Sequence, residues 1–318
     1  MPKEFPRKEF YAHTTERPLN CWEVVALKDR EIEHSQKLKE YSEGRWETEN
    51  KGWTSSPIPT TIDVESTDNG MMLHCGFTEY KYFLGMVKMA IENKNTSSLE
   101  FVHGLSTEIM PLTLDGMFFL NRRSAGATQH GVGFYDVPTA GQNAQMWIDK
   151  IPEEHNGLVR SMLDMTGFPR WNLVRYLGLR LDEITEVKYT GFSKGFEVSL
   201  DSQFNGYALL NLESEEILRR GKNAENLLAY RFDDLNEIFA CIGNDGKEGR
   251  KIKEDIHGKV PEPNERGFVI VDDCYGTLLS NRRHLSANGY SEGIDVLRNR
   301  GYVIKEIPSG NIHLDDFV

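Results

Sequence analysis

Acidic side chains in the middle of the chain have the chemistry of cation ligands or proton donors. Glu153 and Glu154 follow a proline, and Asp164 lies further along. Carboxylate oxygens suit hard cations such as Mg²⁺, and carboxyl groups can act as general acids or bases. Proline and glutamate both favour the first turn of a helix, so the pattern predicts a helix over Pro152–Met165. On that helix Glu153, Arg160 and Asp164 would share one face.

A single ion could not join the two ends of this predicted face. Glu153 and Asp164 are eleven residues apart, which corresponds to about 16 Å along a helix axis. Structural roles therefore compete with metal binding. Glu153 and Glu154 would complement the helix dipole, and Arg160 would form an ion pair with Asp164 or Glu153.

A second group of side chains has the chemistry of a phosphate-binding and base-binding site. Arg122 and Arg123 follow an expected strand at 117–120, where their guanidinium groups could hold phosphate oxygens. Tyr135 and Phe134 could stack on a base. The alternatives are arginines exposed along a strand edge and an ordinary core position for Phe134.

Apolar periodicity and turn signals indicate the elements that must position these residues. Strands at 61–64 and 71–75 are expected around the turn Asp68-Asn69-Gly70, and a hairpin of 108–112 with 117–120 around Asp115-Gly116. The other expected strands are 134–137, 186–192, 196–200, 206–212, 268–271 and 302–307, and the other expected helices are 23–41, 80–91, 214–220, 232–241 and 291–300.

Changes in composition divide the chain into three segments. Residues 1–100 are expected to form an α+β region with a loop or linker at 43–59. Residues 101–245 would form a central domain. Residues 246–318 would form a charged linker followed by a small β–α–β module.

Composition and charge disfavour several classes of protein. The chain has 318 residues and a formal net charge of −12 with histidine neutral, which disfavours nonspecific coating of nucleic acid. No apolar run approaches the ~20 residues of a membrane span, and the first residues do not resemble a signal peptide. The four cysteines are scattered without zinc spacing. We therefore expect a cytoplasmic protein with reduced thiols and no membrane partner.

The order of motifs across residues 101–245 resembles a Nudix homology domain. Residues 115–124, DGMFFLNRRS, resemble a family strand, and residues 133–138, GFYDVP, are similar to its aromatic-Asp-apolar-Pro step. Thr139-Ala140-Gly141 would open the Nudix box, and residues 160–168, RSMLDMTGF, resemble its end, R-E-apolar-x-E-E-x-G-apolar. Residues 232–238 are similar to the closing helix. The resemblance implies an α/β/α sandwich with a mixed sheet, and metal-assisted hydrolysis of nucleoside-diphosphate-linked compounds.

The box departs from the family pattern at its metal ligands. The three glutamate positions hold Ser161, Asp164 and Met165, so only Asp164 could bind Mg²⁺ or Mn²⁺ through a carboxylate. The resemblance places the earlier box glutamate near Glu153 and Glu154. Further carboxylates are available at Glu213, Glu215 and Glu216, which equally suit a solvated helix start.

Two functions follow from the resemblance. In the first, Asp164, Glu153 and Glu154 support metal-assisted hydrolysis, while Arg160 joins Arg122, Arg123 and Tyr135 in binding the substrate. In the second, the fold is kept as a nucleotide-binding or protein-interaction module that has lost its metal site. Either way we expect a small nucleotide-like ligand, and assembly into a homo-oligomer stays open.

The segment after 268–271 offers a third and weaker chemistry. Residues 268–278, FVIVDDCYGTL, resemble the first motif of the haloacid dehalogenase superfamily, which implies Asp273 as a nucleophile in phosphotransfer. The alternative is a capping β–α–β unit with Asp272 and Asp273 at the end of a strand.

Overall fold

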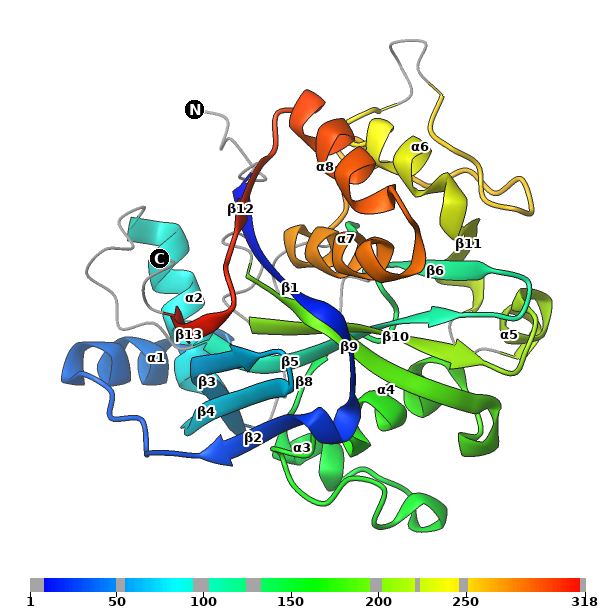
Figure 1. Cartoon of the computed structure of the whole chain (residues 1–318). Coiled ribbons are helices and arrows are strands. Elements are labelled where there is room, and N and C mark those ends of the chain that lie inside the picture. Colours follow the sequence, from blue (N-terminus) through cyan, green and yellow to red (C-terminus); the bar gives the residue numbers. More distant parts are fainter. Residues whose placement is uncertain are drawn as a thin grey trace.

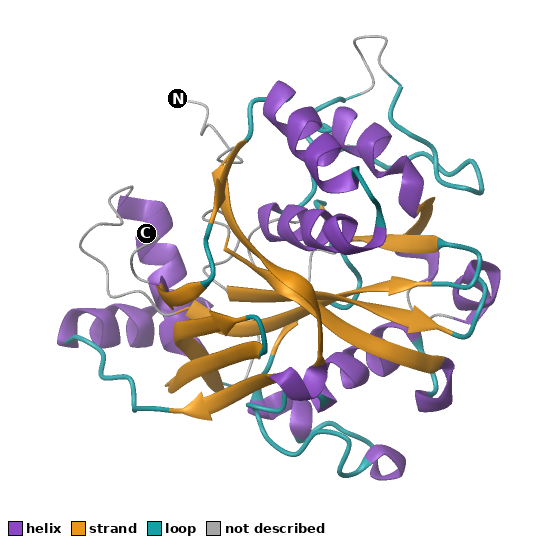
Figure 2. Cartoon of the chain, viewed as in Figure 1, coloured by secondary structure: helices purple, strands orange, loops and turns teal. Residues whose placement is uncertain are grey.

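The computed structural model describes residues 9–49, 55–93, 103–123, 133–194, 202–220, 224–245 and 251–314. Within them, a large mixed sheet carries helices on both of its faces (Figures 1 and 2). The expected α+β class with a mixed sheet is therefore confirmed. None of the helices in the described ranges is long and apolar enough to span a bilayer.

The large sheet has the strand order β12-β1-β9-β10-β5-β3-β4-β2, with β13 paired to β3 and β8 paired to β5. The pairs β10–β5, β1–β12 and β2–β4 are parallel, and the other pairs are antiparallel. The strands are β1 (Glu9–Asn20), β2 (Val24–Lys28), β3 (Pro57–Thr67), β4 (Gly70–Glu79), β5 (His103–Leu112), β8 (Gly141–Gln142), β9 (Ile184–Lys194), β10 (Ser202–Leu210), β12 (Val303–Glu306) and β13 (Gly310–His313). All three expected segments thus contribute strands to one sheet.

A second, three-stranded sheet and the helices complete the described structure. The small sheet has the order β11-β6-β7, formed by β6 (Met117–Arg122), β7 (Tyr135–Asp136) and β11 (Leu227–Arg231). The helices are α1 (Gln36–Glu49), α2 (Tyr80–Asn93), α3 (Gln145–Ile148), α4 (Gly167–Leu177), α5 (Ser214–Arg220), α6 (Leu235–Ala240), α7 (Asp272–Leu285) and α8 (Gly289–Asn299).

Side-chain alternation along β5 separates two apolar cores. Leu105 and Ile109 pack in a core that includes the buried side of α4, whereas Met110 and Leu112 pack in a core that includes α7. Successive side chains of a strand point to opposite faces of a sheet. Figure 1 accordingly shows α4 and α7 on opposite sides of β5, β9 and β10.

Several expected elements are confirmed. β3 and β4 pair in antiparallel fashion around the turn at Asp68-Asn69-Gly70. Helices α2, α5 and α8 lie where apolar periodicity predicts them, and β12 takes up most of 302–307. These elements were predictable because their signals lie within a few neighbouring residues.

The expected helix over 152–165 is wrong. A short 3-10 helix, Glu153–His155, is followed by turns, and the helix α4 begins only at Gly167. Gly157 adopts a φ of 84°, a left-handed conformation that interrupts a right-handed helix and favours glycine.

Three further expectations need correction. The helix over 23–41 is wrong, because Val24–Lys28 forms strand β2 beside β4 and the helix α1 begins at Gln36. The expected hairpin partners 108–112 and 117–120 belong to different sheets. Residues 268–271 form no regular strand: Val269 and Val271 bond to the backbone of Tyr135, whereas Phe268 bonds to the backbone of Gly243 and Asn244. The expected strand 196–200 lies outside the described residues.

Candidate functional site

The structure divides the predicted site residues between the two faces of the large sheet. Tyr135, which neighbours Arg122 in the small sheet, packs in the core that includes α7. Met165, next to Asp164, packs in the core that includes α4. The arginines predicted to bind phosphate and the carboxylate predicted to bind metal are therefore not brought together.

Asp164 is engaged by the backbone at the start of α4. Its Oδ1 accepts hydrogen bonds from the N–H groups of Thr166 and Gly167 at 3.0 and 2.8 Å, and its Oδ2 accepts one from Arg160 N–H at 2.9 Å. The first amides of a helix lack partners within the helix, and a carboxylate satisfies them well. Asp164 thus has a defined structural role in starting α4.

The other predicted acidic ligands do not converge on Asp164. Glu153 and Glu154 are exposed in the 3-10 helix, and Arg160 is exposed as well. No hydrogen bond or ion pair of the described residues connects either glutamate to Asp164. Because Mg²⁺ and Mn²⁺ need several oxygen ligands around one ion, this arrangement does not fit such a site. That an active enzyme would need Mg²⁺ or Mn²⁺ stays a prediction.

The predicted substrate-binding side chains beside the small sheet are engaged with other parts of the chain. Arg122 forms an ion pair with Glu262, and the Tyr135 hydroxyl accepts a hydrogen bond from Glu262 N–H at 2.8 Å. Arg123 lies 3.5 Å from a carboxylate oxygen of Asp136. The two contacts with Glu262 hold the segment around this residue against β6 and β7.

Asp273, the predicted nucleophile, lies within the first turn of α7 rather than at the end of a strand. The side chain of Asp273 is not among those that the structure describes. The neighbouring Cys274 points away from solvent into a buried polar cluster. The haloacid-dehalogenase-like arrangement of a strand ending at the aspartate is therefore not formed, because helix α7 already includes Asp272 and Asp273.

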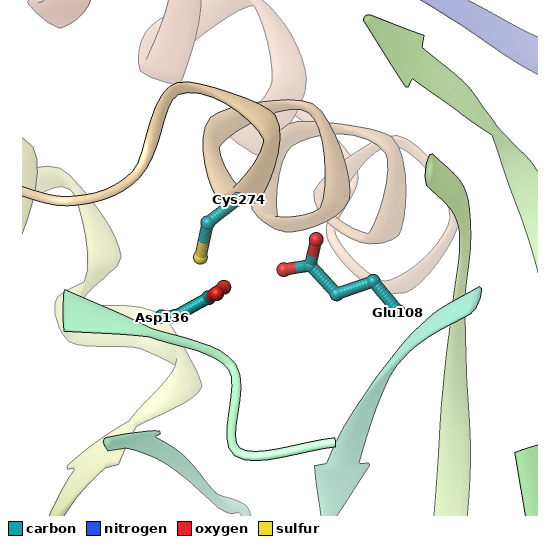
Figure 3. A group of neighbouring side chains, drawn as sticks. All are labelled: Glu108, Asp136 and Cys274. Atoms are coloured by element: carbon teal, nitrogen blue, oxygen red, sulfur yellow. The ribbon is translucent and has the colours of Figure 1, made fainter. Parts of the chain in front are cut away.

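Glu108, Asp136 and Cys274 form that cluster, which no sequence motif predicts. They come from β5, β7 and α7 and point toward one another (Figure 3), with one ligand atom of each within 4.8 Å of the others. Glu108 and Cys274 are fully buried. Burial raises the pKa of the Cys274 thiol well above its ordinary range, and the negative charges of Glu108 and Asp136 raise it further.

The chemistry of this cluster differs from that of a magnesium site. A thiolate with two carboxylates suits a cation that accepts sulfur, whereas Mg²⁺ prefers oxygen ligands and retains water. The raised pKa keeps the thiol protonated and unreactive near neutral pH. Sequence reasoning missed the cluster because its three members are separated by many residues along the chain.

Three polar side chains share one face of α4. Asn172, Arg175 and Tyr176 have the spacing i, i+3 and i+4, which places them together. A Cβ atom added to Gly141 of β8 would lie 3.1 Å from Arg175 Nη2, 3.5 Å from the Tyr176 hydroxyl and 3.8 Å from Asn172 Nδ2. Gly141 has no left-handed φ. Gly141 therefore packs closely against this face of α4, and a side chain at residue 141 would crowd Arg175.

Two aromatic rings contact the guanidinium group of Arg175. Its Cζ lies 4.1 Å from the centroid of Trp147 and 4.3 Å from that of Tyr176, and its Nη2 donates a hydrogen bond of 2.6 Å to the Tyr176 hydroxyl. Asn172 is fully buried and donates to Thr107 Oγ1 at 3.3 Å. Burial lowers the pKa of Arg175, because the charged form loses solvation.

Sequence reasoning also missed this α4 face. A usable signal was present, since the i, i+3 and i+4 spacing of Asn172, Arg175 and Tyr176 can be read directly from the sequence. Comparison with known proteins adds no assignment: no protein-family model matches the chain, and no curated protein is significantly similar to it.

Proposed function

We propose that this chain binds a nucleotide-like small molecule in front of α4 and is a Nudix-like module without the hydrolase metal site. One observation carries the proposal. The face of α4 beside Gly141 presents an amide, a guanidinium and a phenol, from Asn172, Arg175 and Tyr176, and no carboxylate.

A second alignment of the box pattern, different from the one at residues 160–168, supports the same position for the ligand. When the box pattern R-E-apolar-x-E-E-x-G-apolar is aligned with residues 171–179, its apolar, glycine and final apolar positions hold Leu173, Gly178 and Leu179. Its three glutamate positions then hold Asn172, Arg175 and Tyr176. Unlike residues 160–165, most of this stretch is helical, so the three side chains do share one face.

The replacement changes which charge this face attracts. Glutamates would attract cations, and the cations would in turn hold the phosphates of a substrate. A guanidinium, a phenol hydroxyl and an amide donate hydrogen bonds directly to anionic oxygens. A phosphate-bearing ligand would therefore bind without a metal, and the water activation that a metal supplies would be missing.

Binding and turnover should be measured on the same protein. Calorimetric titration with ADP in EDTA is expected to show binding, and added Mg²⁺ or Mn²⁺ is expected neither to tighten it nor to release phosphate from a panel of nucleotides. The D164N variant should bind like the parent chain. Cation-dependent turnover that is lost in D164N would refute the proposal and favour a hydrolase that uses Asp164.

A further inference from the structure

We infer that the Arg175 guanidinium is the centre of a phosphate-binding site covered by the ring of Trp147. The inference rests on the proposed function and specifies it, since it names the part of the ligand that is recognised and the residues that recognise it.

Arg175 has unused hydrogen-bonding capacity. Its Nε and Nη1 atoms are shielded from solvent and have no hydrogen-bond partner among the described residues. Arg175 also forms no ion pair with any of the described residues. A shielded guanidinium without an anion is costly, because the charge has lost water and gained no opposite charge. An oxyanion that accepts from these N–H groups would remove that cost.

Two cationic side chains contact the ring of Trp147. Lys150 Nζ lies 5.0 Å from the centroid of this ring, which Arg175 also contacts. Neither cation has an acidic partner in the described part of a chain whose net charge is −12. Two unneutralised cations at one aromatic ring make this a locally positive place in an acidic protein, and such a place attracts anions.

The side-chain amide of Asn172 favours phosphate over a carboxylate as the ligand. Asn172 Oδ1 is buried and has no donor among the described residues, although the Nδ2 atom of the same amide donates to Thr107. Hydrogen phosphate offers acceptor oxygens for Arg175 and an O–H donor for Asn172 in one group. A carboxylate at neutral pH offers acceptors alone.

Access to the site involves Trp147. This half-buried residue belongs to α3, a helix of four residues, and its ring lies over the guanidinium. An anion that reaches Nε and Nη1 displaces the ring, so binding changes the environment of the indole. Intrinsic fluorescence therefore reports on occupancy of this site.

The test uses inorganic phosphate in EDTA, followed by calorimetry and by tryptophan fluorescence. R175Q is expected to weaken phosphate binding at least about tenfold, the loss typical of a charge-assisted contact. The matched control is R298Q, since Arg298 is also in the last turn of an eleven-residue helix and is exposed; it should bind within about twofold of the parent chain. W147F should abolish the fluorescence change, and acetate should produce none.

The outcomes separate this inference from the proposed function. If ADP binds but phosphate neither binds nor competes, or if R175Q binds as R298Q does, the phosphate site is wrong and the proposed function stands. If neither ADP nor phosphate binds, both fail. If R175Q does not fold, G141A takes its place, because its new Cβ would lie 3.1 Å from Arg175 Nη2 and should weaken phosphate binding.

Discussion

Replacing Asp164 with alanine distinguishes the structural role of this carboxylate from a catalytic one. The side chain accepts three backbone N–H groups at 2.8 to 3.0 Å, two of them at the start of α4. Loss of a helix-capping side chain costs about 1–2 kcal/mol. We expect D164A to lower the free energy of unfolding by that amount, and D164N by less because an amide oxygen still accepts hydrogen bonds.

Urea unfolding followed by circular dichroism measures this effect in EDTA and again with Mg²⁺. The control is D182A, which removes an exposed ion pair with Arg180 and should change stability by less than about 0.5 kcal/mol. The structural reasoning is refuted if D164A unfolds like D182A in EDTA. It is also refuted if Mg²⁺ stabilises the parent chain and not D164A, since that result would identify Asp164 as a cation ligand.

Two further predictions concern α7. G276A should destabilise the protein by about 1–3 kcal/mol or more in urea unfolding, because its Cβ would lie 2.1 Å from Ser193 Cβ in the packed core. The control is G44A in α1, whose Cβ would have nothing within 4 Å and which should be neutral or stabilising. Equal changes in the free energy of unfolding for G276A and G44A would contradict this packing. Burial, and secondarily Arg283, lowers the pKa of His284 to about 4. Stability should therefore be full above the ordinary histidine pKa of ~6.5 and fall as the pH drops from there toward about 4, since the unfolded chain takes up the proton first. H284Q should flatten the fall in urea midpoint between pH 7 and pH 5, and an unchanged slope would contradict the role of His284.

Local signals predicted local structure well. The Asp68-Asn69-Gly70 turn and the amphipathic helices depend on neighbouring residues, which the sequence displays directly. Val24–Lys28 forms a strand where apolar spacing predicts a helix, because its strand conformation depends on pairing with β4, far along the chain. The prediction of a helix over 152–165 is wrong because the left-handed conformation of Gly157 and the capping contacts of Asp164 outweigh the helical spacing of the apolar residues.

The candidate site was harder to predict than the fold. Glu108, Asp136 and Cys274 meet only because three elements from distant parts of the sequence pack together. The polar face of α4 depends on where the helix begins. Because α4 begins at Gly167 and not near Pro152, Asp164, the expected metal ligand, lies before the helix and caps it. Arg175 was overlooked for the same reason, although its spacing to Asn172 was present in the sequence.

The large sheet joins strands that are far apart in the sequence, since β12 lies parallel to β1 and β13 pairs with β3. During synthesis, β1 leaves the ribosome long before its neighbour β12 exists. The native sheet can therefore be completed only after residues 303–313 have been synthesised, and contacts this distant in sequence slow folding. Until then β1 has one open edge, which must avoid pairing with the same strand of another nascent chain.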